Sequence, residues 1–206
     1  MNVHDAIRSA TQRLRDAEVD TPHLDAVLLV GYCLGVEKEE LFREPERELP
    51  QGVAQALDHA VGRRAAGTPI SYIRRRKEFY GREFYVDDRV LVPRPETETL
   101  VEHALGICDT DLPPGPAGVP GTGEVHDCCS GSGCIAITLK AERPELRVSA
   151  SDVSPGAVEV ARLNATRLLP NSDIDIRHGD LLEALRLPPA MITANPPYVA
   201  SADYRR

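Results

Sequence analysis

A glycine-containing turn between an apolar run and a helical pattern constrains this chain more than any other feature. The turn lies within DCCSGSGC, Asp127 to Cys134, where Gly131, Gly133 and Ala136 spell G-x-G-x-x-A. At a strand-to-helix turn, such glycines allow the backbone to approach a ligand closely, and the helix N-terminus offers unpaired N–H groups. The pattern therefore predicts a cofactor loop in an α/β domain.

The residues on both sides of this turn support that prediction, because short apolar runs alternate with helical patterns. Strands are expected at Val125–Cys129, Leu146–Ser151, Ile174–Arg177 and Ala190–Ala194, and helices at Cys134–Glu142 and Pro155–Leu168. Such alternation is typical of a parallel sheet with right-handed crossovers. We expect residues 93–206 to form a Rossmann-like sheet domain, partial at its C-terminal end.

Residues 1–69 show a different, wholly helical pattern. Ala6, Ile7, Ala10 and Leu14 recur at spacings of three or four, which is the repeat of one apolar helix face. Thr21 and Pro22 fit an N-cap and first helical residue, opening a helix that ends near Gly35. Two shorter helices are expected, at Glu37–Arg43 and Val53–Arg64. Together they predict a small N-terminal helical bundle.

The segment 70–92 is expected to link the two domains as a β-hairpin, because apolar and polar residues alternate around Gly81. Helical spacing returns over Thr97–Cys108. The Pro/Gly-rich stretch DTDLPPGPAGVPGTGE, at 109–124, has too few apolar residues to pack and is expected to be a mobile surface loop.

Composition and charge narrow the functional classes. Hydrophobic residues make up 42% and the net charge is −8, which is typical of a globular protein but not of one that grips phosphate backbones over a wide surface. The basic run at 74–77 is too short to carry a nucleic-acid interface alone. No apolar run approaches a membrane span of about 20 residues, and no signal peptide is recognisable, so we expect a cytoplasmic protein, no membrane partner and free thiols.

Cys128, Cys129, Cys134 and His126 raise the alternative of a metal site. Adjacent cysteines on a strand point to opposite faces, and the sequence has no C-x-x-C pair. We therefore expect no metal, and we interpret Cys128 and Cys129 as small apolar residues.

Asp152 follows Gly133 by nineteen residues, at the end of the second expected strand. A carboxylate there can accept hydrogen bonds from both hydroxyls of a ribose. This predicts an adenosine cofactor but does not separate a nicotinamide dinucleotide from S-adenosylmethionine, since both present the same ribose.

The sequence Asn195-Pro196-Pro197-Tyr198 follows the fourth expected strand and favours one of these cofactors. Two prolines fix an extended backbone, so Asn195 and the carbonyl of Pro196 are presented as a rigid pair of acceptors at the strand end. Such a pair suits a planar NH2 group, on which Tyr198 can stack. The motif therefore predicts a binding site for a planar NH2 group, for which a nicotinamide enzyme has no use.

NPPY at this place resembles the amino-group methyltransferases of the Rossmann-like class. LVPRPETETLVE, at 91–102, and EFYGREFYV, at 78–86, are similar to the corresponding segments of the protein glutamine N-methyltransferases that modify peptide chain release factors, the HemK/PrmC family. The resemblance spans nearly the whole chain. NPPY alone is shared with nucleic-acid amino methyltransferases, whereas LVPRPETE is much more specific.

The resemblance implies methyl transfer from S-adenosylmethionine to the side-chain amide nitrogen of the glutamine in a release factor's Gly-Gly-Gln motif. It further implies that the N-terminal bundle helps to dock the release factor, and that the protein is a monomer without stable nucleic-acid binding. The implied cofactor residues are Asp127, Ser130, Gly131, Gly133, Asp152, Asp180 and Asn195. The implied catalytic and substrate-binding residues are Asn195, Pro196, Pro197 and Tyr198.

Two features depart from the family pattern. Cys129 stands where the family's D-x-G-x-G-x-G has its first glycine, so this turn must accommodate a side chain. Four strands are expected where the full fold has seven, which predicts a C-terminally truncated sheet. Two alternatives stay open: a nucleic-acid amino methyltransferase, and a non-catalytic fragment that binds release factors.

Overall fold

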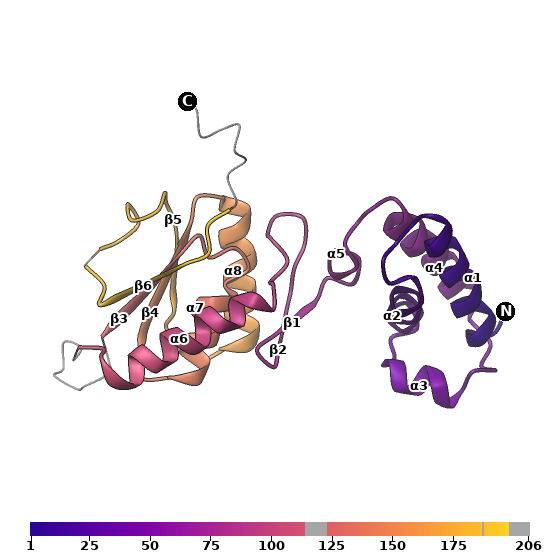
Figure 1. Cartoon of the computed structure of the whole chain (residues 1–206), viewed down its shortest axis with the longest axis horizontal. Coiled ribbons are helices and arrows are strands. Elements are labelled where there is room, and N and C mark those ends of the chain that lie inside the picture. Colours follow the sequence, from indigo (N-terminus) through magenta and orange to yellow (C-terminus); the bar gives the residue numbers. More distant parts are fainter. Residues whose placement is uncertain (114–122, 187, 198–206) are drawn as a thin grey trace, which may run out of the picture. The chain divides into compact units, whose positions relative to one another are not determined.

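The computed structural model describes residues 1–113, 123–186 and 188–197. The chain divides into two compact units after Arg75 (Figure 1). Most of the Pro/Gly-rich loop expected at 109–124 lies outside the described residues, and Asp109 and Thr110 belong to a helix.

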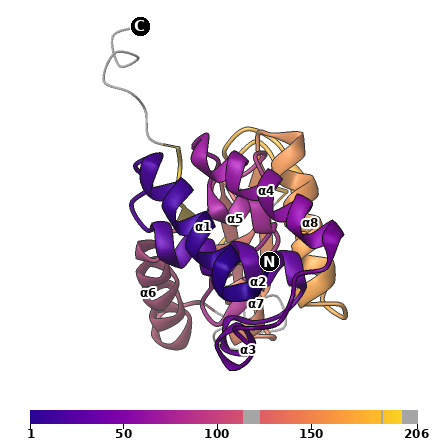
Figure 2. The same cartoon turned by 90° about the vertical axis from the view of Figure 1, so that its right-hand side faces the viewer.

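The first unit is the predicted helical bundle. Its helices are α1 (Val3–Asp16), α2 (Pro22–Leu34), α3 (Lys38–Arg43), α4 (Gln51–Ala65) and α5 (Ile70–Arg74). Helix α1 begins at a capped end, since the Asn2 side chain accepts a hydrogen bond from the Asp5 N–H. Its predicted apolar face is buried against α2 and α4, which lie beside it in Figures 1 and 2. The bundle therefore has a core of its own.

At the N-terminus of α2, the role expected for the Thr21 side chain differs from the one observed. Thr21 is the N-cap residue, but its hydroxyl does not accept a backbone N–H; it donates to Asp25 at 3.0 Å. Asp25 is buried and also accepts a hydrogen bond from Arg64 of α4 at 2.6 Å. Thr21 therefore supports a buried ion pair instead of a helix cap.

The predicted hairpin is present but shorter than expected. Residues 70–74 form helix α5, and only β1 (Lys77–Phe79) and β2 (Arg82–Phe84) pair as antiparallel strands. Tyr80 and Gly81 form the two-residue turn and both have positive φ, which is the requirement of a type I′ turn. Phe79 and Phe84 meet edge to face, with ring centroids 6.0 Å apart, and are buried in the core of the second unit.

The second unit contains the predicted parallel sheet. After α6 (Glu96–Thr110), the chain runs through β3 (Glu124–Cys128), α7 (Cys134–Glu142), β4 (Arg147–Asp152), α8 (Pro155–Leu168), β5 (Asp175–His178) and β6 (Met191–Ala194). The order is β5-β4-β3-β6 and all three pairings are parallel. Because β3 to β4 and β4 to β5 are crossovers in one direction, α7 and α8 cover the same face of the sheet (Figure 1).

Helices α7 and α8 have the predicted boundaries, whereas the strands differ from prediction by one residue at one or both ends. The α8 boundary follows from Ser154, whose side chain accepts the Ala157 N–H, and from Pro155 in the first turn. Strand β3 ends one residue early because Cys129 has φ 57°, a left-handed conformation that cannot continue a strand.

Asn164 of α8 connects the hairpin to the glycine turn. Its Oδ1 accepts the Tyr85 N–H at 2.7 Å, and its Nδ2 donates to the carbonyls of Tyr85 and Ser132, each at 2.9 Å. The Asn164 side chain is fully buried, so if it were lost no water could take its place as the hydrogen-bond partner of Tyr85 and Ser132. A single amide thus ties together segments that are 79 and 32 residues away in sequence.

We expect Asn164→Asp to lower the free energy of unfolding by about 2–4 kcal/mol, because a carboxylate oxygen would face two carbonyls where an NH2 donates now. Urea denaturation followed by circular dichroism measures the change. Asn171→Asp, at an exposed position after α8, serves as the control and should change stability by less than about 0.5 kcal/mol. Equal effects of the two substitutions would contradict the role of Asn164.

Candidate functional site

The site lies where the strand order of the sheet reverses. Strand β3 pairs with β4 on one side and with β6 on the other, because the chain runs outward from β3 through β4 to β5 and then returns to β6. Cys128 of β3 is in register with Ser151 of β4 and Ala194 of β6, so the segments after the three strands begin at one sheet edge. Open α/β sheets bind ligands in the crevice at such a point.

At this edge of the sheet, Asp127 is a buried carboxyl group whose pKa is strongly raised. Its side chain is completely buried; Oδ1 accepts the Thr193 hydroxyl of β6 at 2.8 Å, and Oδ2 has no hydrogen-bond partner. Burial raises the pKa of Asp127 from 3.8 to about 7, although the Thr193 hydroxyl and the nearby backbone N–H of Ala136 in α7 act to lower it. A buried carboxylate oxygen without a partner is costly, which indicates a position for a cationic or N–H-bearing ligand group.

The backbone of the turn after β3 is left-handed at three residues. Cys129, Gly131 and Gly133 have φ values of 57°, 53° and 79°. At Gly133 a Cβ atom would lie 2.9 Å from Ile137 Cδ1 and 3.2 Å from Ala161 Cβ, so only glycine allows this close packing of the turn on α7 and α8. Cys129 adopts its conformation with a side chain, at a cost of about 1–2 kcal/mol.

Asp152 and Ser130 hold the turn over the end of β4. The Asp152 carboxylate accepts the Gly131 N–H and the Ser154 N–H, each at 2.9 Å, while the Ser130 N–H donates to the Ser151 carbonyl. The Ser130 hydroxyl is buried without a partner. Asp152 therefore anchors the turn, and each of its oxygens keeps a lone pair for a ligand hydroxyl.

Asp180 lies in the segment after β5, and neighbouring backbone contacts hold this segment at the same edge. The Gly179 N–H donates to the Asp152 carbonyl at 3.1 Å, and the Ser151 hydroxyl donates to the Leu181 carbonyl at 3.2 Å. The Asp180 side chain is exposed. The structure thus brings the predicted residues Asp127, Ser130, Asp152 and Asp180 to one side of the sheet.

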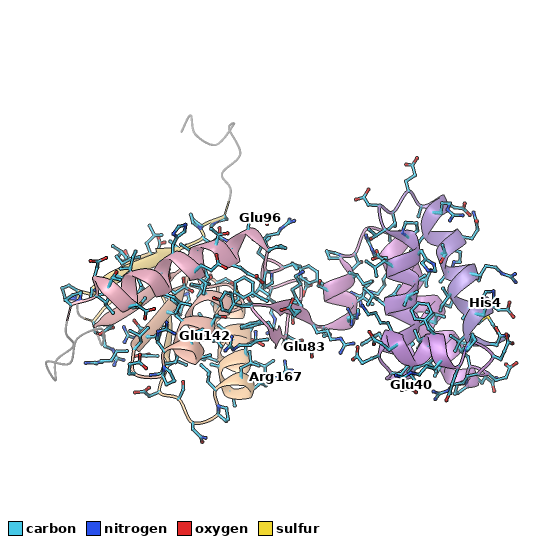
Figure 3. All side chains as sticks on the ribbon, turned by 60° about the horizontal axis from the view of Figure 1, so that its bottom comes forward. His4, Glu40, Glu83, Glu96, Glu142 and Arg167 are labelled. Carbon is cyan, nitrogen blue, oxygen red and sulfur yellow. The ribbon has the colours of Figure 1, made fainter. Side chains whose placement is uncertain are left out.

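Asn195 directly follows β6 and is hydrogen-bonded to the first turn of α6. Its Nδ2 donates to Thr97 Oγ1 at 3.3 Å, and the two residues line a pocket of about 460 Å³ together with Arg94, Glu96 and Leu100. Figure 3 shows Glu96 at this end of α6, pointing away from the helix. Pro196 and Pro197 are exposed, and Tyr198 lies outside the described residues.

Thr97 and Thr193 also belong to this site, although they were not predicted from the sequence. Thr193 was seen only as part of an apolar run, and Thr97 only as the start of a helix. A polar residue within an otherwise apolar strand, next to a strand that carries Asp127, was the available signal for Thr193. Helical spacing was the signal for Thr97, which lies four and seven residues before Val101 and Ala104 and so shares their buried face, whereas Thr99 does not.

The rival metal interpretation is not supported by the surroundings of its residues. The two ring nitrogens of His126 each lie 2.9 Å from a serine hydroxyl, Ser149 and Ser151, and burial lowers the pKa of this imidazole. Among the described residues, no three His, Cys, Asp or Glu side chains are grouped to hold a metal ion. His126 therefore connects β3 to β4 inside the sheet.

Two protein-family models match this chain, one in each of its two compact units. A family model described as the PrmC N-terminal domain matches residues 5–74, and one described as a methyltransferase small domain matches residues 117–205. Among solved structures, the chain is similar to an RNA methyltransferase from Salinibacter ruber in complex with S-adenosyl-L-homocysteine (27% identity, 50% of this chain and 60% of that one, TM-score 0.39). A methyltransferase from Pyrococcus furiosus matches at 17% identity, over 68% of this chain and 63% of that one, with a TM-score of 0.42.

Curated relatives match over a longer range. The release factor glutamine methyltransferase of Koribacter versatilis is 40% identical over 98% of this chain, and that of Chlorobaculum tepidum is 35% identical over 98%. The chain spans 69% of the length of each of these two relatives and 64% of a third, from Nitratidesulfovibrio vulgaris, which is 38% identical. In the part of the chain that the structure describes, no helix is both long and apolar enough to cross a membrane.

The raised pKa of Asp127 predicts a specific pH dependence of stability. Its folded-state pKa of about 7 exceeds the ordinary 3.8, so the folded chain retains a proton that the unfolded chain has lost, and stability falls as the pH rises from about 4 to 7. We expect Asp127→Asn to remove this fall, at about 1.4 kcal/mol per pKa unit. Urea unfolding of both proteins at pH 4 to 8 measures it. A stability difference that does not change with pH would contradict the assignment.

The left-handed conformation of Cys129 predicts that glycine is tolerated there. Glycine relieves the side-chain strain, but it also raises the entropy of the unfolded chain, and the two effects nearly cancel. Cys129→Gly should therefore raise the free energy of unfolding by between zero and about 1 kcal/mol. Cys33→Gly is the control, since Cys33 is also half-buried but lies inside α2, where glycine should cost about 1 kcal/mol. Thermal denaturation measures both, and equal losses would contradict the strain at Cys129.

Proposed function

This chain belongs to the family of release factor glutamine methyltransferases, and we propose that it transfers a methyl group from S-adenosylmethionine to the side-chain amide nitrogen of glutamine in the Gly-Gly-Gln motif of a release factor. One observation carries the proposal for this chain itself. The glycine turn after β3 and Asn195 after β6 meet at one sheet edge, joined by the Thr193–Asp127 hydrogen bond. This arrangement would place the proposed cofactor and amide sites next to each other.

The residues after β3 and β4 suit the polar groups of S-adenosylmethionine. The unpartnered Oδ2 of Asp127 and the unpartnered hydroxyl of Ser130 can accept from the ammonium group of the methionine part. The Asp152 carboxylate would bind the ribose hydroxyls, and Asp180 would accept from the adenine amino group. Gly131, where an added Cβ would meet open space, keeps this surface free of a side chain, whereas Gly133 lets the turn pack closely on α7 and α8.

For this reaction the protein has to position the amide nitrogen and to stabilise the charge that develops during methyl transfer. S-adenosylmethionine supplies an electrophilic methyl group when it is bound. An amide nitrogen is a poor nucleophile because its lone pair is delocalised into the carbonyl group. Asn195 Oδ1 and the carbonyl of Pro196 would accept the two amide hydrogens, holding the nitrogen in line with the methyl group. The prolines restrict the backbone, so these acceptors do not need to be ordered on binding.

The helical bundle is proposed to dock the release factor. Its surface beside α1 has a hollow of about 850 Å³ whose lining includes His4, Ile7, Thr11 and Phe42. Figure 3 shows His4 on α1 at the surface of the bundle. Phe42 is 63% exposed, and such exposed apolar surface favours a protein partner. The net charge of −8 disfavours stable nucleic-acid binding. A monomer acting in the cytoplasm, where translation terminates, fits this role.

The test is peptide-resolved mass spectrometry of an unmodified release factor incubated with this chain and S-adenosylmethionine. We expect one added methyl group on the glutamine of the Gly-Gly-Gln peptide. Asn195→Ala should reduce the rate at least about a hundredfold, since it removes an acceptor aimed at the reacting group. Asn171→Ala, at an exposed site outside the sheet edge, should methylate like the parent.

Two results would overturn the proposal. One is the absence of methylation by a chain that circular dichroism shows to be folded. The other is a methyl group on a different residue of the release factor.

A further inference from the structure

The contact between Asn195 and Thr97 joins two segments that lie 98 residues apart in sequence. Thr97 is in the first turn of α6, is 8% exposed, and accepts the Asn195 Nδ2–H at 3.3 Å. Thr97 is thus held in place by the helix, and Asn195 by the strand and prolines on either side of it.

The direction of this hydrogen bond determines which end of the Asn195 amide remains available. An asparagine side chain has one donor group, the NH2, and one acceptor, the carbonyl oxygen. When Nδ2 donates to Thr97, Oδ1 is left free to accept. With the amide reversed, an NH2 group would face the NH2 group of a bound glutamine, and two donors would oppose each other.

We propose that Thr97 is a positioning residue whose hydroxyl fixes the Asn195 amide with its oxygen toward the substrate. This inference rests on the proposed function and deepens it. Thr97 acts through Asn195 and touches no reacting atom. Its β-branched side chain has few allowed rotamers, and its burial limits them further, so the hydroxyl oxygen stays beside Asn195 Nδ2 and accepts its N–H.

The pocket beside this pair supports the assignment. Asn195 and Thr97 form part of its lining, with Arg94, Glu96 and Leu100 of the segment around the start of α6 completing it. An amide oriented by Thr97 therefore stands at the wall of a space of about 460 Å³, large enough for a glutamine side chain. If the hydrogen bond served only to attach α6 to the sheet, its position at an open pocket would have no consequence.

The kinetic test compares Thr97→Val, which keeps the shape but lacks the hydroxyl, with Thr97→Ser, which keeps the hydroxyl. We expect Thr97→Val to lower kcat for release factor methylation about tenfold, the value of one neutral hydrogen bond at its upper range, with KM for S-adenosylmethionine unchanged. Thr97→Ser should stay within about threefold of the parent. Thr99→Val, exposed on the same helix, is the matched control and should have no effect.

A second measurement reads the hydrogen bond without activity. The side-chain NH2 resonances of Asn195 in a 15N-labelled chain are identified by their loss in Asn195→Ala. We expect Thr97→Val to shift them and to speed their exchange with water, while Thr97→Ser and Thr99→Val leave them in place. Unchanged Asn195 resonances in Thr97→Val would overturn the proposal, as would equal kinetic losses in Thr97→Val and Thr97→Ser.

The kinetic and the resonance measurements also distinguish failure of this inference from failure of the proposed function. If the parent chain transfers no methyl group to the release factor, the proposed function fails at its own test. The resonance measurement then still decides whether Thr97 orients the Asn195 amide.

Discussion

The position of β3 between β4 and β6 determines where the proposed functional groups on and after these three strands lie. Parallel pairing on both sides aligns the ends of three strands, so the segments that follow them emerge at one edge. The Thr193–Asp127 hydrogen bond fixes this alignment with side chains inside the sheet. Displacement of β6 by one residue would turn Thr193 to the other face and leave both Asp127 oxygens buried without a partner.

Burial of Asp127 opposes stability and favours binding for the same physical reason. A carboxyl group in a low-dielectric interior is destabilised when it is charged, which raises its pKa to about 7. An ammonium group next to Oδ2 would reverse this by stabilising the charged form. The folded chain is therefore less stable at neutral pH than it would be without this buried carboxyl group, and a cationic ligand bound there would restore stability. Such costs are typical of functional sites.

The hairpin and α8 are also connected to the glycine turn, through the Asn164 side chain. Asn164 donates to the Ser132 carbonyl within the turn and bonds both backbone groups of Tyr85 at the end of the hairpin. The Tyr80 N–H donates to Glu98 of α6, the helix that also carries Thr97. Of the two segments that resemble the family, the one at 78–86 is thus linked to the glycine turn through Asn164, and the one at 91–102 includes Thr97, which contacts Asn195.

The sequence by itself determined the elements and the residues whose roles depend on local backbone chemistry. Caps and glycines set α7, α8 and the turn between β3 and α7, because N-caps, first-turn prolines and left-handed residues act within a few positions. It also predicted roles for Asp152 and Asn195, since each follows an apolar run, whereas a role for Asp127 was implied only by the family resemblance. Helix α5 was missed because five residues are too few to show a period.

Only the tertiary structure decided how these residues are oriented and held. Thr193, Asn164 and Thr97 act on partners that are 66, 79 and 98 residues away in the chain, and no local periodicity encodes such pairs. The same holds for the burial that perturbs Asp127, which depends on the strands packed on both sides of β3. Local sequence specifies which groups reach the sheet edge, whereas long-range packing specifies their charge, their partners and the direction in which they point.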